Sequence, residues 1–321
     1  MWPKTIPGVL CCGNLVRDIL VAPVDEPRWG RTVWVDSIEE GFGGNGANTS
    51  YTLARLATPV RLIGTLGADE AGDRIAATLQ AAGVDMTFVN RSSKPTPGTV
   101  VLVNHKGARA LLHRPGASHD AFADAVELTP ELTAGCTRFH LANVFALPAL
   151  RPRAADLVAR ARQAGMSVSI DTGWDARGEW LDVLGPCLPH ADLLFVNEDE
   201  ARELTGLGDP VEAARTLEAH GVGTVVVKLG AAGCVVVRAK EIIASPGFAI
   251  PVVDTTGAGD CFAGGFLAAL QRGLSYAHAA RFANAVGALS VQKLGGTTGL
   301  LGYEDTMEWA RHRQTALHGN N

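Results

Sequence analysis

Short runs of apolar, β-branched residues recur along the chain, and helical patterns follow several of them. The clearest runs are GVLCCGNL, PVRLIGTLG, RFHLANVF, MSVSIDTG, ADLLFVN and TVVVKLG. After RLIGTLG, for example, Ile75, Leu79 and Ala82 recur at helical spacing. Alternation of such strands and helices indicates βαβ units, and strands that are apolar throughout are typical of a sheet covered on both faces. The pattern predicts an α/β fold with a mostly parallel central sheet and flanking helices.

Two segments break this pattern. Residues 31–40 alternate apolar and polar positions in part, and residues 98–114 resemble two strands around an HKGA turn. Alternation favours strands with one wet face, hence a small antiparallel sheet outside the core, although edge strands of the main sheet are the alternative. We therefore predict a core of residues 1–17, 43–96 and 116–321, with residues 18–42 and 97–115 as a discontinuous β lid over a substrate site.

Composition excludes several classes of partner. The 321 residues are 47% hydrophobic and 19% charged, with a net charge of -5, so no positive field would gather nucleic acid or an acidic membrane. No apolar run approaches a membrane span, and MWPKTIPGVLCCGNLV is a poor signal peptide, so we expect a cytoplasmic protein. The six cysteines form no CxxC pair and the nine histidines no HExxH, which favours buried thiols and packed or surface histidines such as His113 and His140 over metal ligands.

Some familiar nucleotide and hydrolase motifs are weak or missing. The stretch from Gly41 to Gly46 matches GxGxxG, but it follows the polar DSIEE instead of a buried first strand. The chain has no Gly-Lys dipeptide, which excludes a Walker A loop, and no GxSxG nucleophile elbow. A dinucleotide fold, a P-loop enzyme and an esterase are therefore disfavoured.

The most informative stretch is DTTGAGDCFAGGF, in which Gly257, Ala258 and Gly259 directly precede Asp260. We interpret the preceding IPVVD as a strand end and CFAGGFLAALQRG as an apolar helix, so TGAG would lie at a helix N-terminus. Unpaired N–H groups and the helix dipole bind an anion there. A carboxylate beside a bound phosphate fits a general base that takes a proton from an attacking hydroxyl, whereas the simpler alternative is a helix cap.

At this point the chain resembles the ribokinase-like (PfkB) carbohydrate kinases. DTTGAGDCFAGGF resembles the C-terminal signature of that family, and GFGGNGANTSYTLARLA resembles its N-terminal signature. FVNEDEA resembles its N-x-x-E motif, and VVVKLGAAG its nucleotide-side strand and turn. The motifs occur in the family order and span most of the chain. The resemblance implies a three-layer αβα sandwich with a β lid. It also implies ATP-dependent transfer of the γ-phosphoryl group to a hydroxyl of a small carbohydrate, with a primary hydroxyl as the expected acceptor.

The same resemblance assigns roles to individual residues. Asp260 would be the catalytic base, and Gly257, Ala258 and Gly259 the anion hole. Nucleotide and Mg²⁺ binding would fall to Asn197 and Glu200 through water, to Lys228 and Gly230 at the phosphates or ribose, and to Asn284 near the adenine. Asp18 would bind a substrate diol, aided by Gly44 and Asn48. Taken singly, Asn197 could be a turn residue, Glu200 a helix-start charge and Asn48 a cap.

Many members of the family use a monovalent cation beside the anion hole. Asp254 and Thr256 match one half of that site, and backbone oxygens near Ser290, Lys293 and Gly295 would form the other half. A side-chain oxygen expected slightly further along falls at Gly299, which is a departure from the family pattern. The resemblance therefore implies ATP and Mg²⁺ as cofactors, with K⁺ as a further candidate.

The acceptor is left open by the sequence. Ribokinases tend to carry Asn where this chain has Val16, and an acidic residue where it has Asn143 and Phe145. Phe42, Trp34 and Trp29 near the lid could stack on a base, which would suit a nucleoside kinase of the same fold, but packing within the lid is the preferred interpretation. A non-catalytic sugar or nucleotide sensor is the other alternative. A second copy covering the exposed lid sheet would give a homodimer.

Overall fold

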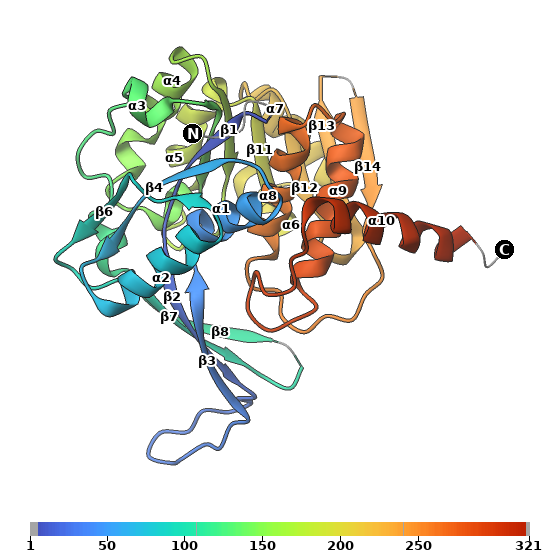
Figure 1. Ribbon diagram of the computed structural model, residues 1–321. Coiled ribbons are helices and arrows are strands. Elements are labelled where there is room, and N and C mark those ends of the chain that lie inside the picture. The colour runs from blue at the N-terminus through green and yellow to red at the C-terminus, as the bar shows by residue number, and fades with distance from the viewer. Residues whose placement is uncertain (1–5, 107, 240, 319–321) are drawn as a thin grey trace.

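The computed structural model describes residues 6–106, 108–239 and 241–318 (Figure 1). The strands are β1 Gly8–Gly13, β2 Val16–Ala22, β3 Ser37–Gly43, β4 Val60–Gly67, β5 Val84–Asp85, β6 Val89–Ser92, β7 Gly98–Val103, β8 Arg109–Arg114, β9 Cys136–Ala142, β10 Ser167–Asp171, β11 Leu193–Asn197, β12 Val225–Lys228, β13 Gly233–Arg238 and β14 Glu241–Pro246. The helices are α1 Asn45–Arg55, α2 Glu70–Ala81, α3 Pro130–Thr133, α4 Ala154–Gln163, α5 Trp180–Leu184, α6 Glu198–Thr205, α7 Pro210–Ala219, α8 Ala258–Gln271, α9 Tyr276–Ser290 and α10 Tyr303–His318.

The large sheet confirms the predicted parallel core. Its order is β14-β13-β12-β11-β10-β9-β1-β4-β5, and β6 pairs with β4. From β12 to β5 every pairing is parallel, while β13 and β14 add an antiparallel edge. Because parallel strands end at the same edge of a sheet, the residues that follow β1, β9, β10, β11 and β12 meet there, where ligands bind in open α/β sheets.

Helices cover both faces of this sheet, so the core has three layers. Alternate residues of β1 point to opposite faces: Leu10 packs in the cluster that contains α4, α6 and α7, and Cys11 packs in the one that contains α1, α2, α8 and α9. Most residues of α9 are buried between the sheet and its neighbouring helices. All six cysteines are free thiols. None of the described helices is long and apolar enough to cross a membrane.

A separate four-stranded sheet with the order β3-β2-β7-β8 projects from the body, with the β2–β3 loop at its far tip (Figure 1). The hairpin predicted in residues 98–114 is present as β7 and β8. The sheet is mixed instead of antiparallel, because β2 and β7 come from distant segments and pair in parallel. Residues 31–36 form no strand, so β3 begins only at Ser37. The proposed division into core and lid remains a prediction.

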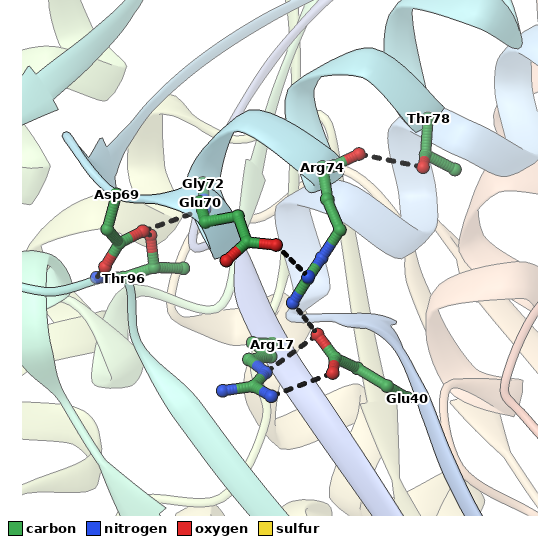
Figure 2. A network of polar contacts seen from close by, with 8 residues as sticks. All are labelled: Arg17, Glu40, Asp69, Glu70, Gly72, Arg74, Thr78 and Thr96. Carbon is green, nitrogen blue, oxygen red and sulfur yellow. Dashed lines mark hydrogen bonds and ion pairs between the residues drawn. The ribbon is translucent and has the colours of Figure 1, made fainter.

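Polar contacts join the base of this sheet to α2 (Figure 2). Glu40 on β3 accepts two hydrogen bonds of 2.8 Å from the guanidinium of Arg17 on β2, and it also pairs with Arg74 on α2. Asp69 caps α2 through the N–H of Gly72 and accepts the backbone N–H of Thr96, which lies just before β7. These contacts hold the segments that enter and leave the small sheet against one helix of the core.

Candidate active site

The glycine-rich turn lies at the start of α8, as predicted. Gly257 is the N-cap residue with φ 69°, a left-handed conformation that favours glycine, and no side chain caps this helix. A Cβ on Gly257 would lie 2.9 Å from Nδ2 of Asn48, and one on Gly259 would lie 3.1 Å from Nζ of Lys228. Small residues are therefore needed where the first-turn N–H groups face polar side chains from other elements. The expected strand end at residues 250–254 is wrong: Val252 and Val253 are exposed and this segment is a loop.

Asp260 is buried in the first turn of α8, and its carboxylate does not cap the helix. Its Oδ1 accepts a hydrogen bond of 2.7 Å from Nδ2 of Asn45, and its Oδ2 accepts one of 2.8 Å from Nδ2 of Asn48. Burial raises the pKa of Asp260, while the two amide donors and the Lys228 ammonium act in the opposite direction. The carboxylate is thus desolvated and oriented by side chains from α1, which suits a proton acceptor better than a cap.

A buried ion pair lies beside this turn. Nζ of Lys228, at the end of β12, donates to Oδ1 of Asp171, at the end of β10, over 2.7 Å. Burial raises the pKa of Asp171, and Glu200 and Asp260 add to the effect. Burial alone would lower the pKa of Lys228, but the attraction of Asp171 and the other carboxylates raises it. Lys228 therefore carries a positive charge next to Gly259.

Asn197 and Glu200 form a capping box at the start of α6. The Asn197 side chain accepts the N–H of Glu200, and Oε2 of Glu200 accepts the N–H of Asn197, both at 2.8 Å. Oε2 of Glu200 also accepts the hydroxyl of Thr172. Both residues therefore have a structural role as caps of α6. Their contact with Mg²⁺ through water remains a prediction.

A cavity of about 610 Å³ opens beside α8. Lys228, Gly230 and Gly259 line one part of it, and Asn284 on α9 lines another. Nδ2 of Asn284 donates to the carbonyl and hydroxyl oxygens of Ser245, both at 3.0 Å, so its amide is held against the end of β14. The remaining lining is mostly apolar, from Phe248, Ile250, Val252, Phe262, Ala288 and Val291. The lining thus combines one ammonium group and glycine backbone with a mostly apolar wall.

Asp18 is buried on the face of the small sheet that carries Leu20 and Val101, which pack near Leu294 of the core. A Cβ on Gly43 would lie 1.9 Å from Oδ2 of Asp18, so the glycine makes room for this carboxylate. Burial raises the pKa of Asp18 to about 7, against the lowering effect of the Thr99 hydroxyl.

Gly44 is the N-cap residue of α1, with φ 91°. A side chain there would meet the carbonyl oxygen of Asn14, since a Cβ would lie 2.7 Å from it. The Gly44 carbonyl accepts the N–H of Asn48, so Asn48 belongs to the body of the helix and is not its cap.

The segments predicted to bind a monovalent cation lie together. Oδ1 of Asp254 accepts the N–H and the hydroxyl of Thr256, and Oδ2 accepts the N–H of Gly295 over 3.0 Å. The carbonyl of Val291, next to Ser290, accepts the N–H groups of residues 253 and 254. Lys293 is exposed in the same turn. A side chain at Gly299 would collide with the Leu289 carbonyl, 2.1 Å from its Cβ, so position 299 offers only backbone groups.

The aromatic residues near the small sheet differ from the expectation of packing within it. Phe42 does pack, with its ring centroid 5.1 Å from that of Tyr51. Trp29 and Trp34 are 102% and 90% exposed in the β2–β3 loop. The prediction that they pack within the lid is therefore wrong for a single chain. Neither tryptophan lines the cavity beside α8.

Sequence reasoning missed three contributors. Asn45 holds Asp260, Asp171 pairs with Lys228, and Arg109 on β8 donates to the Thr256 hydroxyl over 2.7 Å. Asp171 could have been found from the sequence, because it is the acidic residue at the end of a largely apolar strand in MSVSIDTG. Arg109 offered none, because only folding brings β8 to the turn before α8.

Comparison with known proteins agrees with this geometry. The model of the pfkB family carbohydrate kinases matches residues 8–301. A ribokinase of Haemophilus influenzae is 28% identical over 309 residues, covering 94% of this chain and 97% of that protein. An aminoimidazole riboside kinase of Salmonella typhimurium is 31% identical over 271 residues, covering 80% and 84% of the two chains. The structure of Arabidopsis thaliana ribokinase complexed with ribose and ATP superposes with a TM-score of 0.82 at 27% identity, covering 95% of this chain and 99% of that one.

Proposed function

Since the chain belongs to the pfkB family of carbohydrate kinases, which transfer a phosphoryl group from ATP to an alcohol, we propose that it phosphorylates a hydroxyl of a small sugar with Asp260 as the base. The observation that carries this proposal is the buried carboxylate of Asp260 beside the glycine turn at the start of α8. A sensor would have no use for a desolvated proton acceptor at that place.

The reaction uses three features of the site. The acceptor hydroxyl lies against Asp260, which takes its proton as the new bond forms between that oxygen and the γ-phosphorus. The bond from the γ-phosphorus to the bridging oxygen breaks, and ADP leaves. Backbone N–H groups of Gly257, Ala258 and Gly259 and the ammonium of Lys228 would stabilise the charge that spreads over the transferred group, with the N–H of Ala258 giving up its 3.3 Å bond to the Thr255 carbonyl.

Residues of the small sheet would recognise the acceptor sugar. Asp18 supplies a buried carboxylate that can accept two hydrogen bonds from a diol, and Asn48 and Gly44 line the approach to Asp260. Asn143 has both ends of its amide engaged, in bonds to Asn45 and to the N–H of Ala146. Unlike an acidic residue at this position, Asn143 has no carboxylate for the sugar, and its amide is already hydrogen-bonded within the protein. A nucleoside is the second candidate, because the similar Salmonella protein is named as a riboside kinase.

The residues present fit both proposed ions in their chemistry. Glu200 is a buried carboxylate near Lys228, and it would hold Mg²⁺ through water while the phosphates supply direct ligands. Among the described residues no group of three or more His, Cys, Asp or Glu could hold a metal ion. The carboxylate of Asp254, the hydroxyl of Thr256 and backbone carbonyls near Ser290, Lys293 and Gly295 would supply the oxygen ligands that a hard monovalent cation requires. In this structure Asp254 accepts the donors of Thr256 and Gly295, and Arg109 donates to the Thr256 hydroxyl, so K⁺ would have to displace the guanidinium. Bound K⁺ would add positive charge beside the anion hole.

A homodimer through the small sheet is also part of the proposal. The strand register places Ile19, Val21, Ile38, Val100, Leu102 and Leu112 on one face of the sheet. Ile38 and Leu112 are 69% and 64% exposed, and Trp29 and Trp34 extend from the adjoining loop. An apolar sheet face with free edges is suited to a second copy of itself.

The deciding experiment measures ADP release with a panel of free sugars, sugar phosphates and nucleosides. We expect one class to support turnover at least ~10-fold above the others. On the best acceptor, Asp260→Asn should lower kcat by roughly 10²–10⁴ or more with ATP affinity little changed, because the amide cannot take a proton.

Two results would count against the proposal. If folded Asp260→Asn turned over about as fast as the wild type, Asp260 would be excluded as the catalytic base. Binding of a sugar without ADP release from any acceptor would favour the sensor. Asn104→Asp is a matched exchange between amide and acid at the end of β7. Asn104 contacts only the N–H groups of Lys106 and Ala108 through its side chain, so this change should leave kcat unchanged.

A further inference from the structure

The base is held by a chain of amide groups that starts at the backbone. The N–H of Ala146 donates to Oδ1 of Asn143 over 3.2 Å, and Nδ2 of Asn143 donates to Oδ1 of Asn45 over 2.9 Å. Nδ2 of Asn45 then donates to Oδ1 of Asp260 over 2.7 Å. These groups come from the end of β9, the start of α1 and the start of α8, so three elements meet in one line.

The direction of each amide in this chain is dictated by its ends. A backbone N–H can only donate, so the oxygen of the Asn143 amide faces Ala146, whose N–H it shares with the Asn143 carbonyl at 3.3 Å, and the NH₂ group faces Asn45. The ionised carboxylate of Asp260 can only accept, so Asn45 must turn its NH₂ group toward Asp260. The two requirements are compatible, because Asn45 accepts from Asn143 with its oxygen and donates to Asp260 with its NH₂ group. The N–H of Asn45 also donates to Oδ1 of Asn14 over 2.9 Å, which fixes the backbone at this residue.

The surroundings of Asn143 are shaped for its amide. Asn143 has φ 62°, in the left-handed region that asparagine tolerates better than most residues. Gly173 leaves the space that the amide fills, because a Cβ there would lie 2.3 Å from Nδ2 of Asn143. Asn143 is also 8% exposed, so water does not easily replace its hydrogen bonds.

We propose that Asn143 is a positioning residue that acts on Asp260 through Asn45, fixing the Asn45 amide in the one orientation that donates to the base. This proposal rests on the role of Asp260 given above. Without Asn143, the oxygen of the Asn45 amide loses the donor that holds it, so the NH₂ group of Asn45 and the Asp260 carboxylate bound to it can shift together away from the acceptor hydroxyl. A hydroxyl that is misplaced by about 1 Å can lose 10²-fold in rate.

Several other groups act on Asp260 and must be counted in any pH dependence. They are Lys228 on β12, Glu200 on α6, Asp171 on β10, Asp18 on β2, and the thiols of Cys11 on β1 and Cys261 on α8. Asn143 is uncharged and contacts Asp260 only through Asn45. A neutral replacement of Asn143 therefore changes none of these charges directly.

The test is a double-mutant cycle in kcat. Asn143→Asp keeps the size and the acceptor for Ala146 but replaces the NH₂ donor by an oxygen, which attracts Nδ2 of Asn45 away from Asp260. We expect kcat to fall about 10- to 100-fold, and the acidic limb of the kcat–pH profile to move to higher pH, because Asp260 loses a donor. In an Asn45→Ala background the same change should lower kcat less than ~3-fold, since the connecting amide is gone.

Asn143→Gly tests the same idea without adding a charge and suits the left-handed backbone if the aspartate variant does not fold. Its kcat should also fall in the wild-type background and change little in the Asn45→Ala background, with ATP affinity unaltered in both. Equal losses in the two backgrounds, or no loss in either, would overturn the relay. A different result would contradict the proposed function, namely an Asp260→Asn protein that keeps its turnover.

Discussion

The ammonium of Lys228 lies 2.7 Å from the carboxylate of Asp171 and faces the helix turn at Gly259, where a Cβ would be 3.1 Å away. The side chain of Lys228 is 14% exposed and that of Asp171 is 4% exposed. The pair joins the ends of β12 and β10 beside the start of α8. One carboxylate thus holds a cation beside the turn, and we expect the pair to have a structural and a functional part that substitutions can separate.

Lys228→Met should lower kcat/KM for ATP by roughly 10²–10³, because a positive charge beside the transferred group is lost. It should also lower the free energy of unfolding by about 3–5 kcal/mol, because Asp171 is left buried without its partner. The double variant Lys228→Met/Asp171→Asn should recover most of the stability and none of the activity. Chemical denaturation and steady-state kinetics measure the two effects. Recovery of activity in the double variant would assign the pair a structural role alone.

The turn at Gly259 should show a trade between stability and activity. Gly259→Ala removes a flexible residue from the first turn of α8 and should raise the free energy of unfolding by about 0.5–1 kcal/mol. The new methyl group should lower kcat/KM at least ~10-fold, because it stands between Lys228 and an approaching phosphate. Gly185→Ala is the matched control: its backbone is helical, with φ -49° and ψ -49°, and its Cβ would meet nothing within 4 Å. A Gly259→Ala enzyme as fast as Gly185→Ala would contradict this account of the turn.

Local sequence was enough for the parts of the site that are local in sequence. Gly257, Ala258, Gly259 and Asp260 adjoin one another, so the turn could be predicted from helix-end physics and from the family resemblance. Contacts between distant segments could not: Asn45 and Asp260 are 215 residues apart, and Asp171 and Lys228 are 57 apart. Their pairing depends on where α1 and the ends of the strands lie after folding.

The same limit explains the errors in the fold. The parallel core was predictable because its strands are apolar on both faces and are followed by helical patterns. Val252 and Val253 are equally apolar, yet they are exposed in a loop and so gave a false strand end. Trp29 and Trp34 were assigned to packing on their size, but no part of the described chain covers them. Hydrophobicity alone does not distinguish a residue buried in the chain from one available to a second copy.

Potassium should activate the enzyme if the Asp254 segment binds it. Replacing choline chloride by an equal concentration of KCl at constant Mg²⁺ should raise the rate of ADP release, because a cation beside the anion hole strengthens its positive field. Asp254→Asn should reduce the activation, since it removes the charge that links Thr256 to Gly295. The same rate in both salts would remove the cation from the proposed function without affecting the role of Asp260.

The dimer proposal is tested by two adjacent leucines that point to opposite faces of the small sheet. Leu112 pairs with Val100 on the apolar outer face, and Leu111 pairs with Val101 on the face toward the core. Their exposed fractions are similar, at 64% and 59%. Leu112→Glu should convert a dimer to a monomer in light scattering at micromolar concentration, whereas Leu111→Glu should leave it dimeric. A wild-type monomer at these concentrations would contradict the proposal.

Asp18 links stability to pH in a direction opposite to that of most surface carboxylates. Its pKa is about 7 in the folded chain because it is buried, against about 3.9 for an exposed aspartate in the unfolded chain. Between these values the folded chain holds a proton that the unfolded chain has lost. The resulting stability is fully present below about pH 4 and is lost as the pH rises through about 7.

Asp18→Asn should therefore make the protein more stable and less able to bind its acceptor. At pH 8 the free energy of unfolding should rise by roughly 1–4 kcal/mol over the wild type, and the gain should shrink toward pH 5, because asparagine never ionises. The KM for the sugar should rise strongly, since the diol loses a carboxylate. Asp25→Asn is the control in the same region: contact with His105 lowers the pKa of exposed Asp25, so its removal should bring no gain at pH 8. Thermal unfolding at both pH values decides the matter, and a gain for Asp18→Asn that does not change with pH would show that ionisation of this carboxyl is not the cause.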